Sequence, residues 1–472
     1  MRSSLLLVAV FVIAGCDQSP TVTIDDELLV GKYVGENVAA FLGVPFAEPP
    51  VGDLRWRAPQ ALTSKQERRD TTEFAAACMQ TMRILDWYRY MAETFGASPD
   101  YYEDLEVSED CLYLNIWTPT LESDAKLPVM VWVHGGSNIS GWSYEKNYRG
   151  HILAPQGVIV ITVAYRQGVF GFLSHPELEG ERAVANFGLW DLVAALRWIQ
   201  DNIEQFGGDP NRVTLFGESA GGENILALMA AEPAQHLFHR GVLQSASGIG
   251  LSMPTVQDEQ QRGSELMQAV GAKSLQDLRK IDAATLLEAY TELAADHYHS
   301  PAIDDQLITK STWKSLQSDK WPDHALIIGT NADEYLDRAA TAKEYACPSQ
   351  NVAAKRTATG GDAWLYFFSR VREDAAGAEI GAYHGAEYPY VFGVHDDYMT
   401  TTDRDLDLST AMQKYWVNFA ATGNPNGDGL PEWPMFKRPD ALIQELGDEI
   451  RTIPAIEPEM CAAFEAWNGQ TK

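Results

Sequence analysis

The stretch from Asn186 to Gly222, NFGLWDLVAALRWIQDNIEQFGGDPNRVTLFGESAGG, carries the pattern that decides the fold. Within residues 191–206, apolar side chains recur at the 3.6-residue period of an amphipathic helix, and the glycines and proline of 207–210 end that helix. A strand-like run at 213–216 follows, and then a turn of small residues before a second helical stretch. Helix, strand, turn and helix in this order predict a parallel sheet covered by helices.

Other apolar runs extend this sheet on both sides of the stretch. The expected strands are residues 129–133, 158–163, 241–244, 325–329 and 364–368. Residues 255–295 have a helical pattern and predict a cap over the carboxyl edge of the sheet. Because strands alternate with helices and no internal repeat is present, we expect a single α/β domain with a central, mostly parallel sheet.

The turn between strand and helix contains Gly217-Glu218-Ser219-Ala220-Gly221, which fits the pattern G-x-S-x-G. In a strained turn of this kind the serine hydroxyl projects at the end of the sheet, close to a helix N-terminus whose amides favour negative charge. The pentapeptide alone also fits an ordinary serine in a strand–helix turn, since the chain has 37 glycines. Its position after a strand and before a helix favours Ser219 as a nucleophile.

Two more motifs precede this turn in the chain. They are LGVPFA at 42–47, followed by PPVG at 49–52, and EDCLYLN at 109–115. Together with residues 186–222 they resemble the type-B carboxylesterase and cholinesterase family, and the resemblance covers most of residues 28–245 with patches beyond. It implies an α/β-hydrolase fold with an N-terminal β-hairpin, and ester hydrolysis through an acyl-serine intermediate. A catalytically inactive, cholinesterase-like binding protein is the alternative from another class.

The same resemblance places the partners of Ser219. The acid lies in the segment GTNADEY at 329–335, where Glu334 takes the acidic position and Asp333 is the competing choice. The histidine is His384, in the segment YHGAEYPYVFG, while the neighbours of His395 do not match the motif. The resemblance implies that His384 is the general base and that Glu334 orients it.

A serine ester hydrolase also needs N–H donors for the developing oxyanion. His134-Gly135-Gly136-Ser137 resembles the H-G-G-G loop of the family, but Ser137 replaces its third glycine. The implied donors are the backbone amides of Gly136, Ser137 and Ala220. Each donor contributes roughly 3–4 kcal/mol to transition-state stabilisation, so a misplaced Ser137 would slow turnover.

The N-terminus predicts export and a lipid anchor. Arg2 precedes an apolar run at 5–14, which is shorter than the roughly 20 residues of a membrane-spanning helix. Ile13-Ala14-Gly15-Cys16 resembles the lipobox of bacterial lipoproteins, and an ordinary secretory signal is the alternative. We expect a signal peptide at 1–15, a tether at 16–27 that begins with lipidated Cys16, and an esterase domain at 28–472. The protein would then face the periplasm or the cell exterior.

The other four cysteines allow three pairings in an oxidising compartment. The resemblance favours Cys78 with Cys111 and Cys347 with Cys461. It also implies two structural salt bridges, which are Arg55–Glu109 and Arg166–Asp191.

The charge balance restricts the possible partners. The chain has 66 acidic and 36 basic residues, a net charge of −30 that repels nucleic acid and anionic membranes. We expect a small-molecule ester as substrate, no nucleic-acid partner, and no metal or organic cofactor. A metal-dependent hydrolase using His297 and His299 is a weaker hypothesis, because the chain has no convincing third ligand at a suitable spacing.

Trp87, between the first two cysteines of the domain, invites comparison with the ammonium-stacking residue of cholinesterases, but its position favours core or surface packing.

Overall fold

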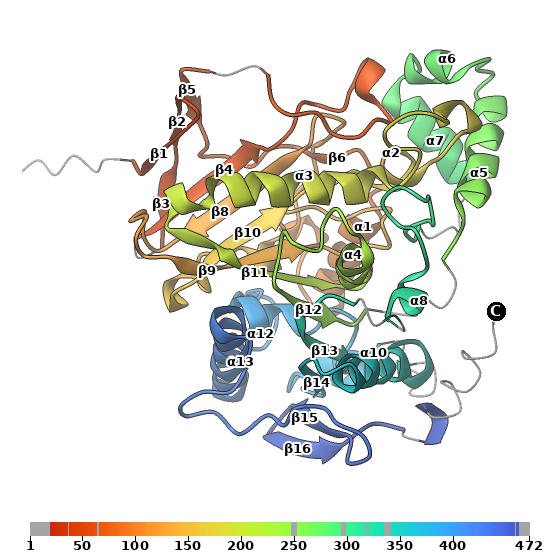
Figure 1. Ribbon diagram of the computed structural model, residues 1–472. Helices are drawn as coiled ribbons and strands as arrows, with labels where there is room; N and C mark the ends of the chain where they lie inside the picture. Colours follow the sequence, from red (N-terminus) through yellow and green to blue (C-terminus); the bar gives the residue numbers. More distant parts are fainter. Residues whose placement is uncertain are drawn as a thin grey trace, which may run out of the picture.

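The computed structural model describes residues 19–35, 37–63, 66–246, 253–293, 299–316, 318, 321–334, 341–457 and 459–461. In these residues a large twisted sheet crosses the molecule, and helices cover both of its faces (Figure 1). This arrangement confirms the predicted α/β-hydrolase fold. The predicted signal peptide and Cys16 lie outside the described residues.

The central sheet has eleven strands in the order β16-β15-β14-β13-β12-β11-β9-β10-β8-β4-β3. From β15 to β10 all neighbouring strands are parallel, whereas β16 at one edge and β8, β4 and β3 at the other are antiparallel to their neighbours. The strands are β3 (Lys32–Val34), β4 (Val38–Pro45), β8 (Tyr113–Thr118), β9 (Leu127–Val133), β10 (Ile159–Val163), β11 (Gly208–Glu218), β12 (Arg240–Gln244), β13 (Ala325–Asn331), β14 (Ala363–Phe368), β15 (Leu442–Leu446) and β16 (Ile450–Pro454). All six predicted strands are present, and β11, predicted at 213–216, begins earlier than expected.

The helices connect the strands and also form the predicted cap. They are α1 (Arg83–Thr94), α2 (Gly168–Phe172), α3 (Phe187–Asn202), α4 (Ala220–Ala230), α5 (Val256–Ala269), α6 (Leu275–Arg279), α7 (Ala283–Leu293), α8 (Thr312–Leu316), α10 (Cys347–Ala358), α11 (Ala375–Ile380), α12 (Tyr388–Phe392) and α13 (Asp403–Thr422). The segment predicted as helical contains α5, α6 and α7. Across the described ranges, none of these helices has both the length and the apolar character needed to cross a bilayer.

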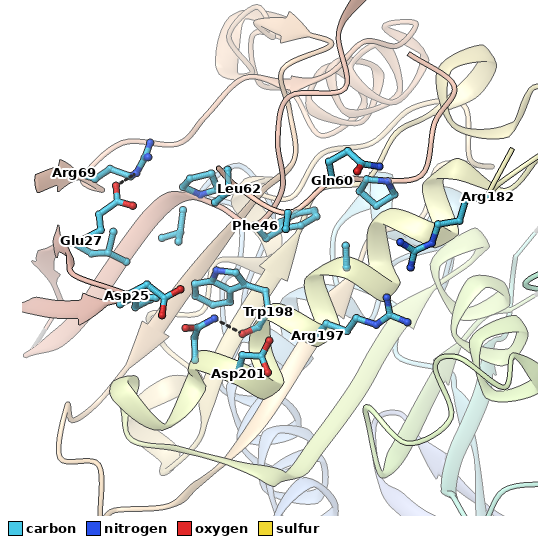
Figure 2. Close-up of a pocket in the computed structure, with 18 residues that line it drawn as sticks. Asp25, Glu27, Phe46, Gln60, Leu62, Arg69, Arg182, Arg197, Trp198 and Asp201 are labelled. Atoms are coloured by element: carbon cyan, nitrogen blue, oxygen red, sulfur yellow. Dashed lines mark hydrogen bonds and ion pairs between the residues drawn. The ribbon is translucent and has the colours of Figure 1, made fainter. Parts of the chain in front are cut away.

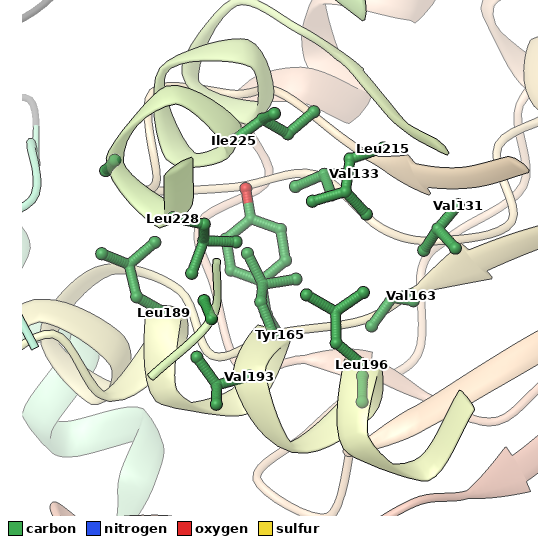
Figure 3. Packing of buried hydrophobic residues seen from close by; sticks show 14 of the residues in the cluster. Val131, Val133, Val163, Tyr165, Leu189, Val193, Leu196, Leu215, Ile225 and Leu228 are labelled. Carbon is green, nitrogen blue, oxygen red and sulfur yellow. The ribbon is translucent and has the colours of Figure 1, made fainter. Parts of the chain in front are cut away.

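Two hydrophobic cores hold the sheet between its helices. Val131 and Val133 of β9 pack in the first core, which Figure 3 shows against α3 and α4. Met130 and Trp132, which point to the other face, pack in the second core with α12 and α13. Burial on both faces explains why these strands are unbroken apolar runs in the sequence.

The predicted tether at 16–27 is wrong in its second half. Thr21–Ile24 forms strand β1, which pairs with β2 (Glu27–Val30), and β5 (Arg68–Asp70) completes a small three-stranded sheet. Val22 of β1 is buried, so alternation of polar and apolar residues at 21–24 was the signal for a strand.

The predicted covalent and ionic links of the scaffold are confirmed. Disulfides join Cys78 to Cys111 and Cys347 to Cys461. The partly buried pair Arg55–Glu109 and the buried pair Arg166–Asp191 are present, with N–O distances of 2.5 and 2.7 Å.

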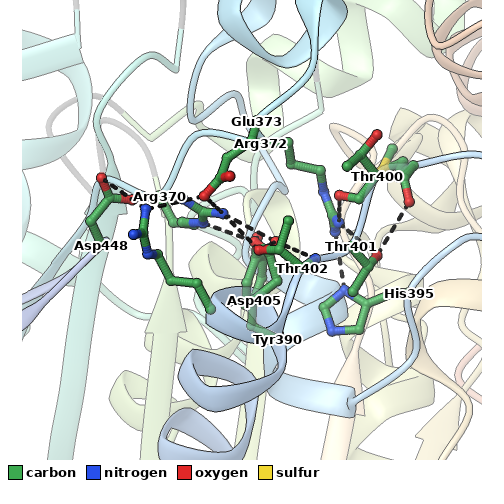
Figure 4. A network of polar contacts seen from close by, with 12 residues as sticks. Arg370, Arg372, Glu373, Tyr390, His395, Thr400, Thr401, Thr402, Asp405 and Asp448 are labelled. Carbon is green, nitrogen blue, oxygen red and sulfur yellow. Dashed lines mark hydrogen bonds and ion pairs between the residues drawn. The ribbon is translucent and has the colours of Figure 1, made fainter.

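A polar network centred on buried Arg370 and Asp405 connects α12 and α13 to the segment that follows β14 (Figure 4). The guanidinium of Arg370 donates to Asp405 of α13 at 2.8 Å and to Asp448 at 2.6 Å. Tyr390 of α12 donates to Asp405 at 2.6 Å. Burial opposes ionisation of Asp405, but the bonds from Arg370 and Tyr390 hold its pKa below the usual range. The network therefore fixes the helix that follows His384.

Candidate active site

Ser219 stands at the end of β11, in the turn that leads into α4. Its backbone has φ 53° and ψ −127°, a conformation that side-chain-bearing residues rarely adopt. A Cβ at Gly217 would lie 2.5 Å from the carbonyl oxygen of Val133, and one at Gly221 would lie 2.1 Å from the same oxygen. The two glycines of the motif are thus required by the close approach of β9, and the turn presents Ser219 at the carboxyl edge of the parallel strands.

His384 and Glu334 meet at this edge. Nδ1 of His384 lies 2.5 Å from Oε2 of Glu334. The other carboxylate oxygen accepts hydrogen bonds from the hydroxyl of Thr330 at 2.7 Å and the backbone N–H of Asn331 at 2.8 Å. Because Glu334 is buried and held at one oxygen, its second oxygen is fixed toward the imidazole. Among the described contacts, no hydrogen bond joins the Ser219 hydroxyl to His384, although both residues line one pocket.

The competing residues occupy other positions. Oδ2 of Asp333 accepts a hydrogen bond from the backbone N–H of Ala382 at 2.9 Å, so this carboxylate braces the loop that carries His384. His395 lies in the polar network of Figure 4, where Nδ1 is 3.0 Å from Nη2 of Arg372. Burial and the charge of Arg372 lower the pKa of His395 to about 4. The geometry therefore pairs Glu334, and not Asp333, with His384.

The loop predicted to supply oxyanion donors lies beside Ser219. Gly136 and Ser137 line the same pocket, and Ala220 follows Ser219 at the first position of α4, where a helix leaves its N–H groups unpaired. Gly136 has φ 102° and Ser137 has φ 59°. Ser137 thus keeps the left-handed backbone conformation that glycine adopts without strain. The backbone strain of a residue with a side chain in this conformation is the cost of replacing the third glycine. Among the described residues, the amides of Gly136 and Ser137 donate no hydrogen bond within the protein.

Asn138 ties this loop to the nucleophile helix. Its side-chain amide donates to the carbonyl oxygen of His299 at 2.8 Å, and its Oδ1 accepts from Asn224 of α4 at 2.7 Å. The hydroxyl of Tyr165 donates to the carbonyl oxygen of His134 at 2.8 Å. These bonds orient the loop before any ligand binds.

The pocket containing Ser219 has a volume of about 330 Å³. Helix α1 forms one wall, and Trp87 on this helix is 39% exposed with its ring 6.4 Å from that of Tyr383. The carboxyl of Glu145 lines the pocket and accepts a hydrogen bond from Tyr88 of α1. Burial raises the pKa of Glu145 to about 8. The expectation that Trp87 packs in the core or at the surface is wrong, because Trp87 lines the pocket that contains Ser219. The position of α1 depends on tertiary packing, which the sequence around Trp87 does not show.

A larger cavity, of about 560 Å³, lies along the flank of α3 (Figure 2). Trp198, Arg197 and Asp201 of α3 face it, and the ion pair Glu27–Arg69 lies on its opposite wall with an N–O distance of 2.6 Å. None of the predicted site residues lines this cavity. The smaller pocket, which contains a serine beside a histidine–carboxylate pair, is therefore the candidate active site.

Glu218 is a site residue that the sequence did not single out. Its Oε1 lies 2.9 Å from Nε2 of His384, and its side chain is buried. The residue stands at a variable position of the G-x-S-x-G pattern, so the motif carries no information about it. Glu387, which follows His384 by three residues, is also buried, and accepts hydrogen bonds from Gln244 at 3.0 Å and Asn331 at 2.6 Å.

The histidines of the metal hypothesis do not form a ligand set in the described part of the chain. Nε2 of His299 lies 2.9 Å from the hydroxyl of Tyr290, and His297 lies outside the described residues. Within those residues, no three His, Cys, Asp or Glu side chains are grouped so that they could hold a metal ion.

A parallel sheet with a serine on a strained strand–helix turn, beside a histidine–carboxylate pair, defines the α/β-hydrolase class. A profile of the carboxylesterase family matches residues 18–344 and 336–462. The chain belongs to this family and is a serine carboxylesterase, an enzyme that hydrolyses carboxylic esters.

The relatives include enzymes from animals and bacteria. Liver carboxylesterase of Sus scrofa is 30% identical over 516 residues, covering 90% of this chain and 89% of that protein. Fumonisin B1 esterase of Sphingopyxis macrogoltabida is 32% identical over 466 residues, covering 85% of this chain and 82% of that protein. The structure of a thermophilic PNB esterase is similar with a TM-score of 0.83 and 28% identity, covering 94% of this chain and 99% of the other.

Proposed function

We propose that this enzyme hydrolyses esters through a Ser219–His384–Glu334 triad and an acyl-serine intermediate. The observation that carries the proposal is the 2.5 Å contact between Nδ1 of His384 and Oε2 of Glu334, in a pocket that Ser219 also lines. This contact engages Nδ1, so Nε2 is the nitrogen that can accept the proton of the Ser219 hydroxyl. It also fixes which nitrogen carries hydrogen in the neutral ring.

In the acylation step, Ser219 attacks the ester carbonyl while Nε2 of His384 takes the hydroxyl proton. The buried carboxylate of Glu334 stabilises the imidazolium that forms. The amides of Gly136, Ser137 and Ala220 stabilise the oxyanion of the tetrahedral intermediate. The alcohol then leaves with the proton from His384, and the acyl group remains on Ser219.

In the deacylation step, water replaces the alcohol. His384 removes a proton from the water, which attacks the acyl-serine, and the carboxylate product leaves with Ser219 restored. Every proton transfer in both steps uses side chains of this chain, so the proposed route needs no cofactor.

Covalent trapping tests the acyl-serine intermediate. A brief reaction with p-nitrophenyl acetate, quenched in acid, is expected to add one acetyl group to the peptide that contains Ser219, because acylation precedes the slower attack of water. Tandem mass spectrometry locates the adduct, and pretreatment with a fluorophosphonate should abolish it. An adduct on another residue, or a burst without any adduct, would contradict the proposed route.

We also propose that the enzyme is exported and anchored by lipid at Cys16, on the periplasmic or outer side of a bacterial membrane. The lipobox-like sequence Ile13-Ala14-Gly15-Cys16 supports this proposal. Cys16 itself lies outside the described residues. The five residues from Cys16 to Pro20 precede β1 and span at most about 18 Å, so the anchor would hold the enzyme close to the membrane.

The change Cys16→Ser is expected to move the enzyme from the membrane pellet to the soluble fraction, because the lipid chains are attached through the thiol. Esterase activity in both fractions measures the distribution, and a metabolically incorporated alkyne fatty acid reports lipidation. Equal partitioning of the two proteins would argue against the anchor.

A further inference from the structure

The cavity along the flank of α3 is separate from the candidate active site. It has a volume of about 560 Å³, and none of its lining residues also lines the pocket of Ser219. Its walls come from α3, from the turn between β1 and β2, and from the loop at 59–62 (Figure 2). Small-molecule sites in proteins have volumes of about 300–1,000 Å³, so this cavity is large enough for a ligand of its own.

Two arginines give one end of the cavity a positive charge. Arg182 and Arg197 are exposed, and Figure 2 shows both guanidinium groups at the same end. In the ranges that the structure describes, neither guanidinium has a hydrogen-bond or ion-pair partner. The chain has 66 acidic and 36 basic residues, so this is not for want of carboxylates. Because parallel N–H donors of a guanidinium match the two oxygens of a carboxylate, this end of the cavity favours an anionic group.

The other charged groups of the cavity restrict where an anion can bind. Nε of Arg69 lies 2.6 Å from Oε1 of Glu27, so this pair carries no net charge. Asp25 and Asp201 lie away from Arg182 in Figure 2. Their negative charge repels an anion from their own part of the cavity, which leaves the arginine end as the place for it.

The middle of the cavity is apolar. The half-buried ring of Trp198 faces it, and Phe46 and Leu62 lie across from this ring (Figure 2). A flat apolar body that packs against an indole ring removes the exposed face of that ring from water. The cavity therefore combines a place for an anionic group with an apolar surface beside it.

We propose that this cavity is a second binding site, for an organic carboxylate with a flat apolar body. The carboxylate contacts Arg182 and Arg197, and the apolar body packs against Trp198. A small inorganic anion would leave the apolar middle uncovered, and a neutral aromatic compound would leave both guanidinium groups unpaired. Carboxylates are one product of ester hydrolysis, so the reaction itself supplies ligands of this class. The inference goes beyond the proposed triad and does not depend on it.

Fluorine NMR with 4-fluorobenzoate tests the site. The enzyme is first treated with a fluorophosphonate, which blocks the pocket of Ser219 so that the benzoate cannot bind there. At low salt we expect a Kd of about 1 mM for a ligand of this size, and weaker binding in about 0.5 M NaCl because salt screens the charges. Inorganic phosphate and 4-fluorobenzyl alcohol should each bind at least about tenfold more weakly, because phosphate lacks the apolar body and the alcohol lacks the charge.

The variants Arg182→Gln and Arg197→Gln assign the binding to this cavity. Each removes one exposed guanidinium and should raise the Kd of 4-fluorobenzoate about tenfold, because the charge-assisted hydrogen bonds of that group are lost. Arg68→Gln is the matched control, since Arg68 is also exposed but does not line the cavity. Its Kd should stay within about twofold of the wild type.

An unchanged Kd in both arginine variants would overturn the inference, and so would the lack of any binding below about 10 mM. If phosphate or the alcohol bound as tightly as 4-fluorobenzoate, the proposed class of ligand would be wrong. If the fluorophosphonate did not modify Ser219, the proposed nucleophile would fail, but the comparison of the arginine variants would still decide whether this cavity binds the carboxylate.

Discussion

The change Ser219→Ala is expected to lower kcat for p-nitrophenyl acetate by about 10⁵- to 10⁶-fold and to leave the fold intact. The variant removes one oxygen atom and keeps the Cβ, so the strained backbone at φ 53° is no harder to form than in the wild type. Without the hydroxyl, His384 has no nucleophile to activate, and no acyl-serine forms. Steady-state kinetics measure the loss of kcat. Thermal unfolding of the variant and the wild type is the control for folding.

Ser245→Ala is the matched control for this experiment. Ser245 follows β12 as Ser219 follows β11, it also has a positive φ of 45°, and it is buried. It does not line the pocket of Ser219, so its replacement should leave turnover within about twofold. If Ser219→Ala were as active as Ser245→Ala, the nucleophile would be a residue other than Ser219. A wild-type enzyme without any turnover would instead favour the inactive binding protein.

The central sheet was predictable because its strands are buried on both faces. Such strands, 129–133 and 158–163 among them, appear as continuous apolar runs that do not depend on distant parts of the chain. Strand β1 was missed because it is short and only one face of it is buried. Its pattern of four alternating residues is too brief to distinguish from a polar tether without its partner β2.

The site residues were predictable where each stands within a motif whose neighbouring residues also match the family pattern. Ser219, His384 and Glu334 stand in such motifs, and the structure brings His384 and Glu334 into contact. The contact of His384 with Glu218 was not predictable, because it depends on how the turn between α11 and α12 packs against the end of β11, which is distant in sequence. The wall formed by Trp87 also depends on tertiary packing, since nothing in the sequence of α1 shows which loop it packs against.

The second large effect is expected for Glu334→Gln, with a loss of about 10³- to 10⁴-fold in kcat. In the variant, the side-chain carbonyl oxygen can keep the bonds from Thr330 and Asn331. The new amide group then faces Nδ1 of His384 and donates to it. Neutral His384 would carry its hydrogen on Nε2, the nitrogen that must accept the proton of Ser219, so the base is present in the wrong tautomer.

Asp333→Asn separates this effect from damage to the neighbouring loop. Asp333 carries the same charge one residue away, but its carboxylate accepts from the backbone of Ala382 and does not face His384. Its loss should lower turnover less than about tenfold, because one such hydrogen bond contributes about 1 kcal/mol. Measuring kcat for both variants at the pH optimum decides the assignment. A larger loss in Asp333→Asn than in Glu334→Gln would transfer the orienting role to Asp333 and require the 381–384 loop to move before catalysis.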